Sequence, residues 1–301
     1  MTARLAVYTT IYPGVEAYLR DWHRSLLGQS DQDFSLWIGL DRLPAEAAMR
    51  ALGADPGATW VEAAPGDTPA RLRERALERI VESCDGVVLV DSDDLLHPSR
   101  IAGAREALRS SDLTACALRL VDHAGLDLGH ILTLPPAMSP ETLLPRHNVF
   151  GFSNSAFRTA ALRECLPIPS TVLLVDWFLA TRAWLRGDKL GFDRAIRMDY
   201  RQHDANMTQV RPPFSGSQVT RDTARVLDHL REVLASLPAG ALRGRLVELE
   251  RMAADVEVFH RRTVLDPARL ERYVQALEAL PFVPLWWSSV AHPELRHMWI
   301  H

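Results

Sequence analysis

Three carboxylates, Asp91, Asp93 and Asp94, fall within four consecutive positions, directly after an apolar run at residues 86–90. The run predicts a buried strand, so the chain leaves the interior and enters the acidic segment at once. Two carboxylates about 4 Å apart repel one another by roughly 4 kcal/mol at an effective dielectric near 20. A hard divalent cation such as Mg²⁺ or Mn²⁺ takes oxygen ligands, commonly one or two carboxylates together with phosphate oxygens. The segment therefore predicts a divalent cation that holds a diphosphate.

An Asp-x-Asp pair by itself is weak evidence for a metal site, because a chain of 301 residues contains about one such pair by chance. The competing interpretation is an Asx turn that caps the helix predicted to begin at Pro98. The strand before the pair and the helix after it favour the metal site.

The elements around this segment alternate between strand and helix. Apolar, β-rich runs at 5–10, 34–40, 59–62, 86–90 and 113–120 predict strands, and helical spacing fills the intervals between them. This alternation predicts an α/β fold with a mostly parallel, doubly wound sheet flanked by helices. Ligands of such sheets bind at the carboxyl ends of the strands. Asp41 and the acidic segment both follow strand ends, so we expect them to face one crevice.

The second half of the chain changes character. Residues 121–170 are rich in Pro, Gly and Asn and predict loops and short strands, followed by a helix at 172–185 and a strand at 190–200. From residue 218 onward, leucine and valine recur at helical spacing with breaks at 238–240 and before 267. We expect a first domain at 1–215, with halves at 1–120 and 121–215, and a C-terminal α-helical extension at 216–301.

Several segments carry a resemblance. Residues 88–98, with Asp-Ser-Asp-Asp followed shortly by Pro98, resemble the Asp-x-Asp segment of glycosyltransferase family 2. Segments at 7–14, 68–75, 148–158, 175–177 and 200–206 agree with that family in order and spacing. The resemblance covers about residues 4–210. It implies the GT-A fold, which is Rossmann-like, and a metal-dependent, inverting transfer of a sugar from a nucleotide-diphosphate donor to an acceptor hydroxyl.

The resemblance also implies roles for individual residues. Asp176 would be the catalytic base. Asp93, with Asp91 and His203, would hold Mn²⁺ or Mg²⁺. The nucleotide sugar, linked to UDP, GDP or dTDP, would contact Thr9, Tyr12, Asp41, Arg71, Asp91 and Ser92. The acceptor would be a glycan, a lipid-linked sugar or a small molecule.

Two positions depart from the family pattern. Val175 replaces the Glu of a Glu-Asp motif, although Asp176 keeps the position of the base. The family's Asp-Asp-Gly-Ser run is absent after the second strand, where Asp41 is followed by Arg42. The contacts to base and ribose, and hence the donor, stay open.

Each candidate also has a structural interpretation. Asp176 could be an N-terminal helix charge favoured by the macrodipole, and His203 and Asp41 could be turn residues. Arg71 could belong to a solvated helix face shared with Arg73 and Arg75. Two alternatives to the transferase remain: a sugar nucleotidyltransferase, disfavoured because residues 9–14 contain no Arg or Lys, and a catalytically degenerate protein that binds a sugar or nucleotide.

The composition limits which binding partners and which cellular compartment can be expected. The net charge of −4 argues against nucleic acid, no apolar run approaches the length of a membrane span, and no signal-peptide pattern opens the chain. The three cysteines have no metal-like spacing and predict buried thiols in a reducing compartment. We expect a cytoplasmic protein, free or peripheral to the inner face of the membrane. Its C-terminal helices are expected either to form a homodimer or to pack back on the first domain.

Overall fold

The computed structural model of the chain describes residues 4–203, 206–207, 209–282 and 284–300. Its first half follows the predicted alternation. The elements are β1 (Leu5–Ile11), α1 (Glu16–Leu27), β2 (Phe34–Leu40), α2 (Ala45–Leu52), β3 (Thr59–Glu62), α3 (Pro69–Ser83), β4 (Gly86–Leu89), β5 (Leu95–Leu96), α4 (Arg100–Ala107) and β6 (Leu113–Val121).

The second half adds short elements and then long helices. They are β7 (Asp127–Leu132), α5 (Pro140–Leu143), β8 (Ser155–Arg158), α6 (Thr159–Cys165), α7 (Val175–Arg186), β9 (Leu190–Arg201), α8 (Gly216–Ala235), α9 (Arg243–Phe259), η1 (His260–Val264), α10 (Pro267–Glu278), η2 (Pro293–Leu295) and α11 (His297–Ile300). The helical C-terminal region predicted from residue 216 begins at that residue.

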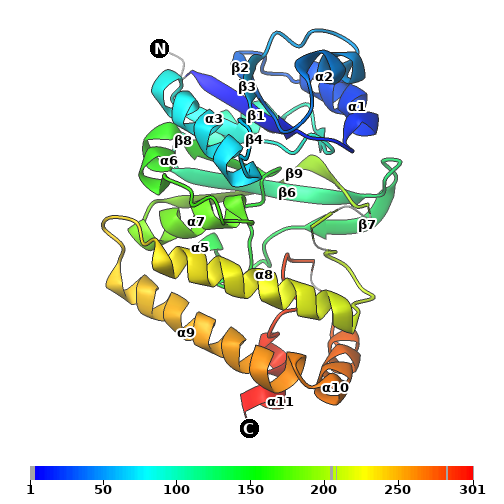
Figure 1. Cartoon of the computed structure of the whole chain (residues 1–301), viewed down its shortest axis with the longest axis vertical. Helices are drawn as coiled ribbons and strands as arrows, with labels where there is room; N and C mark the ends of the chain where they lie inside the picture. Colours follow the sequence, from blue (N-terminus) through cyan, green and yellow to red (C-terminus); the bar gives the residue numbers. More distant parts are fainter. Residues whose placement is uncertain (1–3, 204–205, 208, 283, 301) are drawn as a thin grey trace.

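One mixed sheet organises residues 5–201. In the described chain its strand order is β3-β2-β1-β4-β8-β6-β9-β5, with β7 paired to β6. Neighbours from β3 to β4 are parallel, as are β6 and β9, whereas β8 is antiparallel to both of its neighbours. The α/β fold with flanking helices is therefore confirmed, and the parallel part predicted from the alternation covers the first four strands (Figure 1).

Burial explains why the parallel strands are uniformly apolar. All seven residues of β1 and all four residues of β4 are buried, because helices cover both faces of the sheet there. The three cysteines are buried and free, as predicted.

The sequence did not predict the positions of two short strands. Leu95 and Leu96 form β5 against β9, at a place where the sequence suggested the approach to a helix. Strand β8 inserts between β4 and β6, within residues 121–170, for which loops and short strands were expected without defined sheet partners. Both strands depend on distant partners, and local sequence patterns do not encode such partners.

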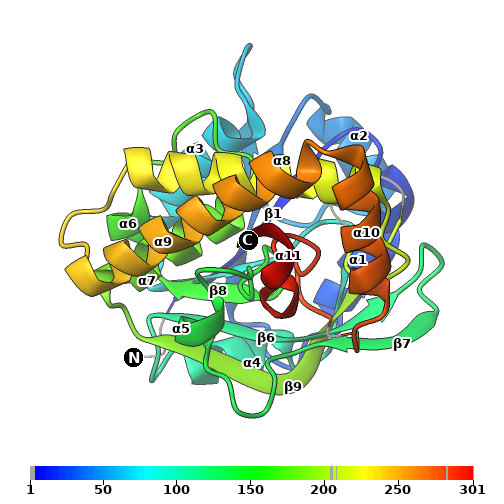
Figure 2. The same cartoon turned by 90° about the horizontal axis from the view of Figure 1, so that it is seen from below.

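The C-terminal helices pack back on the first domain. Helices α8 and α9 run side by side below α7, and α11 is tucked between α9 and α10 (Figures 1 and 2). His229 on α8 stacks on Trp177 of α7 with ring centroids 4.1 Å apart, and the backbone N–H of Leu242 donates to the carbonyl of Leu185 at 2.7 Å. The packing alternative for these helices is thus observed. Within the described residues, no helix is both long and apolar enough to span a bilayer.

Candidate active site

The acidic segment lies at the carboxyl end of β4, as the sequence predicted. After Leu89 the chain turns through residues 91–94 and continues into β5, which pairs with the end of β9. Asp93 and Asp94 are only 6% and 1% exposed. Carboxylates are rarely this buried unless they are paired, so the partners of each one define its role.

Asp94 is fully engaged by the protein. One carboxylate oxygen accepts from the backbone N–H of Arg201 at 2.7 Å, and the other accepts from the hydroxyl of Ser153. Burial raises its pKa well above the ordinary value, and the neighbouring Asp93 and Asp91 carboxylates raise it further. Asp94 therefore fastens the acidic segment to β9, and Asp91 and Asp93 remain to meet a ligand.

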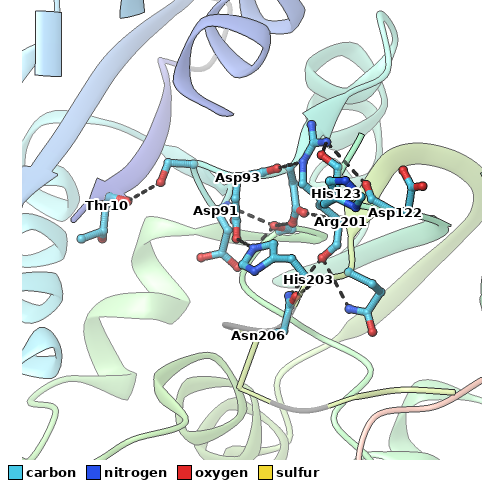
Figure 3. A network of polar contacts seen from close by, with 12 residues as sticks. Thr10, Asp91, Asp93, Asp122, His123, Arg201, His203 and Asn206 are labelled. Atoms are coloured by element: carbon cyan, nitrogen blue, oxygen red, sulfur yellow. Dashed lines mark hydrogen bonds and ion pairs between the residues drawn. The ribbon is translucent and has the colours of Figure 1, made fainter. Parts of the chain in front are cut away.

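The side chains of His203 and Asp93 are in contact, although 110 positions of sequence separate them. The imidazole Nε2 lies 2.9 Å from Asp93 Oδ2 (Figure 3). The ring also stacks on Tyr18 of α1, with centroids 5.2 Å apart. The sequence predicted both residues as metal ligands, and the structure brings them together. The neighbouring positions 204 and 205 of the same family-like motif lie outside the described residues.

Arg201 links the end of β9 to the acidic segment through hydrogen bonds. Its side chain is 3% exposed, its Nε donates to the carbonyl of Asp93 at 2.8 Å, and its guanidinium donates to the carbonyl of His123 at 2.7 Å. The guanidinium also lies 4.7 Å from the ring centroid of Tyr18. Figure 3 shows these bonds joining the end of β9 to the acidic segment.

Asp91 stands between negative and positive neighbours. Its pKa is raised to about 7, chiefly by burial and then by the Asp93 carboxylate, whereas the Arg73 guanidinium acts in the opposite direction. An Arg73 nitrogen lies 3.9 Å from Asp91, and its guanidinium sits 4.6 Å from the ring centroid of Phe152. The neighbouring carboxylates repel one another, so further positive charge bound at this end of the sheet would be stabilising.

Asp176 lies in the first turn of α7 and faces the same site. Its Oδ2 accepts from the Asn148 side chain at 2.9 Å and from the backbone N–H of Phe152 at 3.1 Å. Burial raises the pKa of Asp176 above its ordinary value, and its charge contributes to the raised pKa of Asp91. A carboxyl group with a raised pKa and fixed orientation suits a general base.

A single loop, residues 148–154, connects the two carboxylate groups. It holds Asp176 through Asn148 and Phe152, and it holds the acidic segment through Ser153, whose hydroxyl also accepts from the backbone N–H of Asp91 at 3.0 Å. The relative position of Asp176 and Asp91 is therefore set by one short piece of chain.

The other residues predicted to contact the nucleotide sugar differ in their burial and in their distance from the acidic segment. Tyr12 is half-buried, and its pKa is raised by burial and then by Asp93 and Asp91, so it lies beside them. Asp41 follows β2, donates its backbone N–H to the carbonyl of Ile11 at 2.9 Å, and pairs with Arg42 at 3.0 Å. Because β1 lies between β2 and β4, Asp41 shares the sheet edge with the acidic segment without a described contact to it.

Thr9 and Ser92 are wholly inside the protein. Ser92 is 0% exposed and donates its hydroxyl to the carbonyl of Thr10 at 2.8 Å, which ties the acidic segment to β1. The hydroxyl of Thr9 is equally buried and has no hydrogen-bond partner in the described chain.

The structure does not bring Arg71 to the acidic segment. Its guanidinium pairs with the buried Glu74 in the next turn of α3, and its side chain is 52% exposed. Arg73 faces Asp91 instead. The sequence did carry a signal for this, because Arg73 shares helical spacing with the buried Ala70, Leu77 and Ile80. A charged residue on an apolar stripe is expected to have a specific partner.

The donor set suits a hard cation that is also held by a ligand. In the described chain, no three His, Cys, Asp or Glu side chains converge closely enough to bind a metal alone. Asp91 and Asp93 supply the pair of carboxylates that Mg²⁺ typically accepts alongside substrate phosphates. The His203 imidazole beside Asp93 is a further donor that suits Mn²⁺ more than Mg²⁺.

Solved structures share this architecture. No protein-family model matches the sequence, and no curated protein sequence matches it. The mannosyltransferase PcManGT from Pyrobaculum calidifontis, solved with GDP-Man and Mn²⁺, aligns with a TM-score of 0.59 at 15% identity over 93% of this chain and 77% of its own. TarS residues 1–349 from S. aureus, solved with UDP-GlcNAc, aligns with a TM-score of 0.56 at 14% identity over 85% of this chain and 72% of its own.

These similarities establish the fold. The neighbours are glycosyltransferases that bind nucleotide sugars, and the chain described here has their GT-A-like, Rossmann-type architecture.

Proposed function

We propose that the protein is a metal-dependent, inverting glycosyltransferase of family 2 that moves a sugar from a nucleotide-diphosphate donor to an acceptor hydroxyl. The observation that carries the proposal is the loop of residues 148–154, which forms hydrogen bonds with both Asp176 and Asp91 near the carboxyl end of β4. The shared fold of a UDP-GlcNAc-bound and a GDP-Man- and Mn²⁺-bound glycosyltransferase supports it.

The geometry supports the following roles. Asp93 and Asp91, with His203 beside Asp93, would hold a Mn²⁺ or Mg²⁺ ion against the donor diphosphate. When bound, that ion supplies Lewis-acid stabilisation of the charge that develops on the leaving group. Arg73 adds a fixed positive charge next to Asp91. Tyr12 and Asp41 would meet the nucleoside at the ends of β1 and β2.

Asp176 would take the proton of the acceptor hydroxyl. Its carboxylate is oriented by two donors, Asn148 and the backbone of Phe152, and burial raises its pKa toward the range in which a base works best near neutral pH. Attack by the activated hydroxyl in a single displacement inverts the anomeric configuration. The donor would be linked to UDP, GDP or dTDP, and we place the reaction in the cytoplasm.

A thermal-shift panel tests the proposal. Nucleoside diphosphates and nucleotide sugars are each added with Mn²⁺ or with EDTA, and release of nucleoside diphosphate is then followed for any sugar that binds. A ligand at about 100 times its dissociation constant adds roughly 2.7 kcal/mol to stability. The proposal predicts a metal-dependent shift with one nucleotide and slow hydrolysis of its sugar. Binding without hydrolysis or transfer would instead indicate a degenerate binder, and no shift with any nucleotide would overturn the proposal.

A further inference from the structure

A cavity lies beside His203, between the segment that follows β9 and helix α8. Its volume is about 650 Å³, within the usual range for small-molecule sites. The lining residues in the described chain all lie between positions 202 and 225, in the segment after β9 and the first turns of α8. The C-terminal helical region thus contributes one wall of a cavity that begins beside a predicted metal ligand.

Among the described lining residues, the one carboxylate is paired with a basic side chain. Asp222 is buried, and its oxygens lie 3.7 Å from an Arg225 nitrogen and 3.3 Å from the Gln218 side-chain nitrogen. Arg225 also donates to the backbone carbonyl of Met207. Arg225 and Asp222 therefore balance one another and shape the wall.

Two further arginines, Arg211 and Arg221, line the cavity. Among the described residues, neither of these two side chains has a hydrogen-bond or ion-pair partner. Arg221 precedes Arg225 by four positions on α8, so the two lie on one helix face. Two guanidinium groups that border one cavity favour an anion with two charges and several acceptor oxygens, and phosphate is the common example.

The donor diphosphate is not expected to be the ligand of Arg211 and Arg221. The donor would meet residues at the ends of β1, β2 and β4, and none of these strands lines the cavity. The cavity is therefore suited to a second anion.

We propose that Arg211 and Arg221 bind a phosphate group carried by the acceptor, in a cavity whose wall is built by α8. This inference rests on the proposed function and adds the chemical class of the acceptor. The phosphate could belong to a water-soluble sugar phosphate or to a lipid headgroup. Both present the same group to the arginines.

Binding of defined phosphate probes to the full-length chain tests the proposal. Glycerol 3-phosphate is titrated calorimetrically in EDTA, so that no cation-dependent donor site competes. In parallel, sedimentation measures binding to phosphatidylcholine vesicles that contain dihexadecyl phosphate. The variant Arg211→Gln/Arg221→Gln is compared with Arg50→Gln/Arg251→Gln, which removes the same charge from exposed arginines on α2 and α9.

The proposal predicts that the wild type and the control bind at least one probe and that the Arg211→Gln/Arg221→Gln variant binds it about tenfold more weakly. Binding of glycerol 3-phosphate alone identifies a soluble acceptor, and binding only to the charged vesicles identifies a lipid-linked one. Equal binding by variant and control, or no binding of either probe to the wild type, overturns the proposal.

Nucleotide binding separates this inference from the proposed function. The Mn²⁺-dependent thermal shift is measured on the same proteins, and the variant is expected to retain it. If the variant loses that shift as strongly as it loses phosphate, the arginines serve the donor diphosphate and the inference is wrong. If the wild type shows no nucleotide shift but still binds phosphate through these arginines, the proposed function fails and the anion site stands alone.

Discussion

Arg73 on α3 reaches Asp91, with a guanidinium nitrogen 3.9 Å from the carboxylate, whereas Arg71 two positions earlier pairs with Glu74 and points away. A helix turns by about 200° over two residues, so the two arginines cannot serve the same site. The guanidinium of Arg73 therefore faces the candidate site, whereas that of Arg71 lies on the solvated face of α3.

Replacing Arg73 by Gln should weaken metal-dependent nucleotide binding. The Arg73 side chain is only 18% exposed, so the loss of its positive charge beside the predicted diphosphate site is expected to cost about tenfold in affinity, or roughly 1.4 kcal/mol. Calorimetric titration with the preferred nucleotide and Mn²⁺ measures the change. The Arg71→Gln variant serves as the comparison and should change affinity less than threefold. An equal effect of both substitutions would show that the contact to Asp91 is not specific.

Asp176→Asn should remove the base and spare the donor site. The amide keeps the shape of the side chain and can still accept from Asn148 and from the backbone of Phe152. We expect kcat to fall by about 10²–10⁴-fold, the usual contribution of a positioned base. Nucleotide affinity should stay within a few-fold of wild type. A variant that transfers sugar at the wild-type rate would remove Asp176 from the mechanism.

Gly151 lies close to Trp286 of the C-terminal segment. A Cβ at residue 151 would lie 2.9 Å from Cη2 of Trp286, and Gly151 belongs to the loop that orients Asp176 and Asp91. Gly151→Ala is therefore expected to lower the free energy of unfolding by about 1–3 kcal/mol, as overpacked cores do. It should also reduce kcat.

Removing the opposing ring supplies the control for this substitution. Gly151→Ala/Trp286→Leu should recover part of the lost kcat relative to Gly151→Ala, because the added methyl group then meets no ring. Chemical denaturation and transfer kinetics of the single and double variants check this. Strictly additive effects of the two substitutions would contradict the contact.

Two buried histidines should make the fold sensitive to acid. Burial lowers the pKa of His147 and of His229 from 6.5 to about 3 in the folded protein. The unfolded chain takes up these protons near pH 6.5, so the stabilisation is fully present above that pH and is lost as the pH falls toward 3. Between pH 7 and pH 5, each histidine should cost about 2 kcal/mol of the free energy of unfolding.

His229→Phe isolates one of these contributions. The phenyl ring keeps the stack on Trp177 and carries no titrating group. Urea denaturation at pH 7 and pH 5 should therefore show a loss about 2 kcal/mol smaller in the variant than in the wild type. If both proteins lose the same free energy, His229 does not remain neutral in the folded state.

The sequence predicted the parallel half of the sheet and the place of the acidic segment well. Long apolar runs such as the one ending at Leu89 are buried on both faces, and this leaves a clear local signal. The C-terminal helices were also evident from their spacing. The partnership of Asp93 with His203 was expected only from the family resemblance, because 110 positions separate the two residues.

What the sequence could not predict depends on tertiary contacts. Strand β5 has two residues and exists because β9 lies beside it. The role of Ser153 in holding Asp91 and Asp94 requires the return of a loop about 60 positions later. The cavity beside α8 likewise forms only when a C-terminal helix packs near the end of β9, so neither composition nor periodicity predicts it.

Binding of Mn²⁺ to the full-length chain in the presence of its preferred nucleoside diphosphate tests the central claim most directly. Electron paramagnetic resonance counts free Mn²⁺ as protein is added, for the wild type, for Asp93→Ala and for Asp21→Asn, which alters an exposed aspartate on α1. The account predicts nucleotide-dependent Mn²⁺ binding in the wild type and in the Asp21 control, and its loss in Asp93→Ala with the fold intact. Wild-type Mn²⁺ affinity in Asp93→Ala would contradict the metal site and, with it, the proposed chemistry.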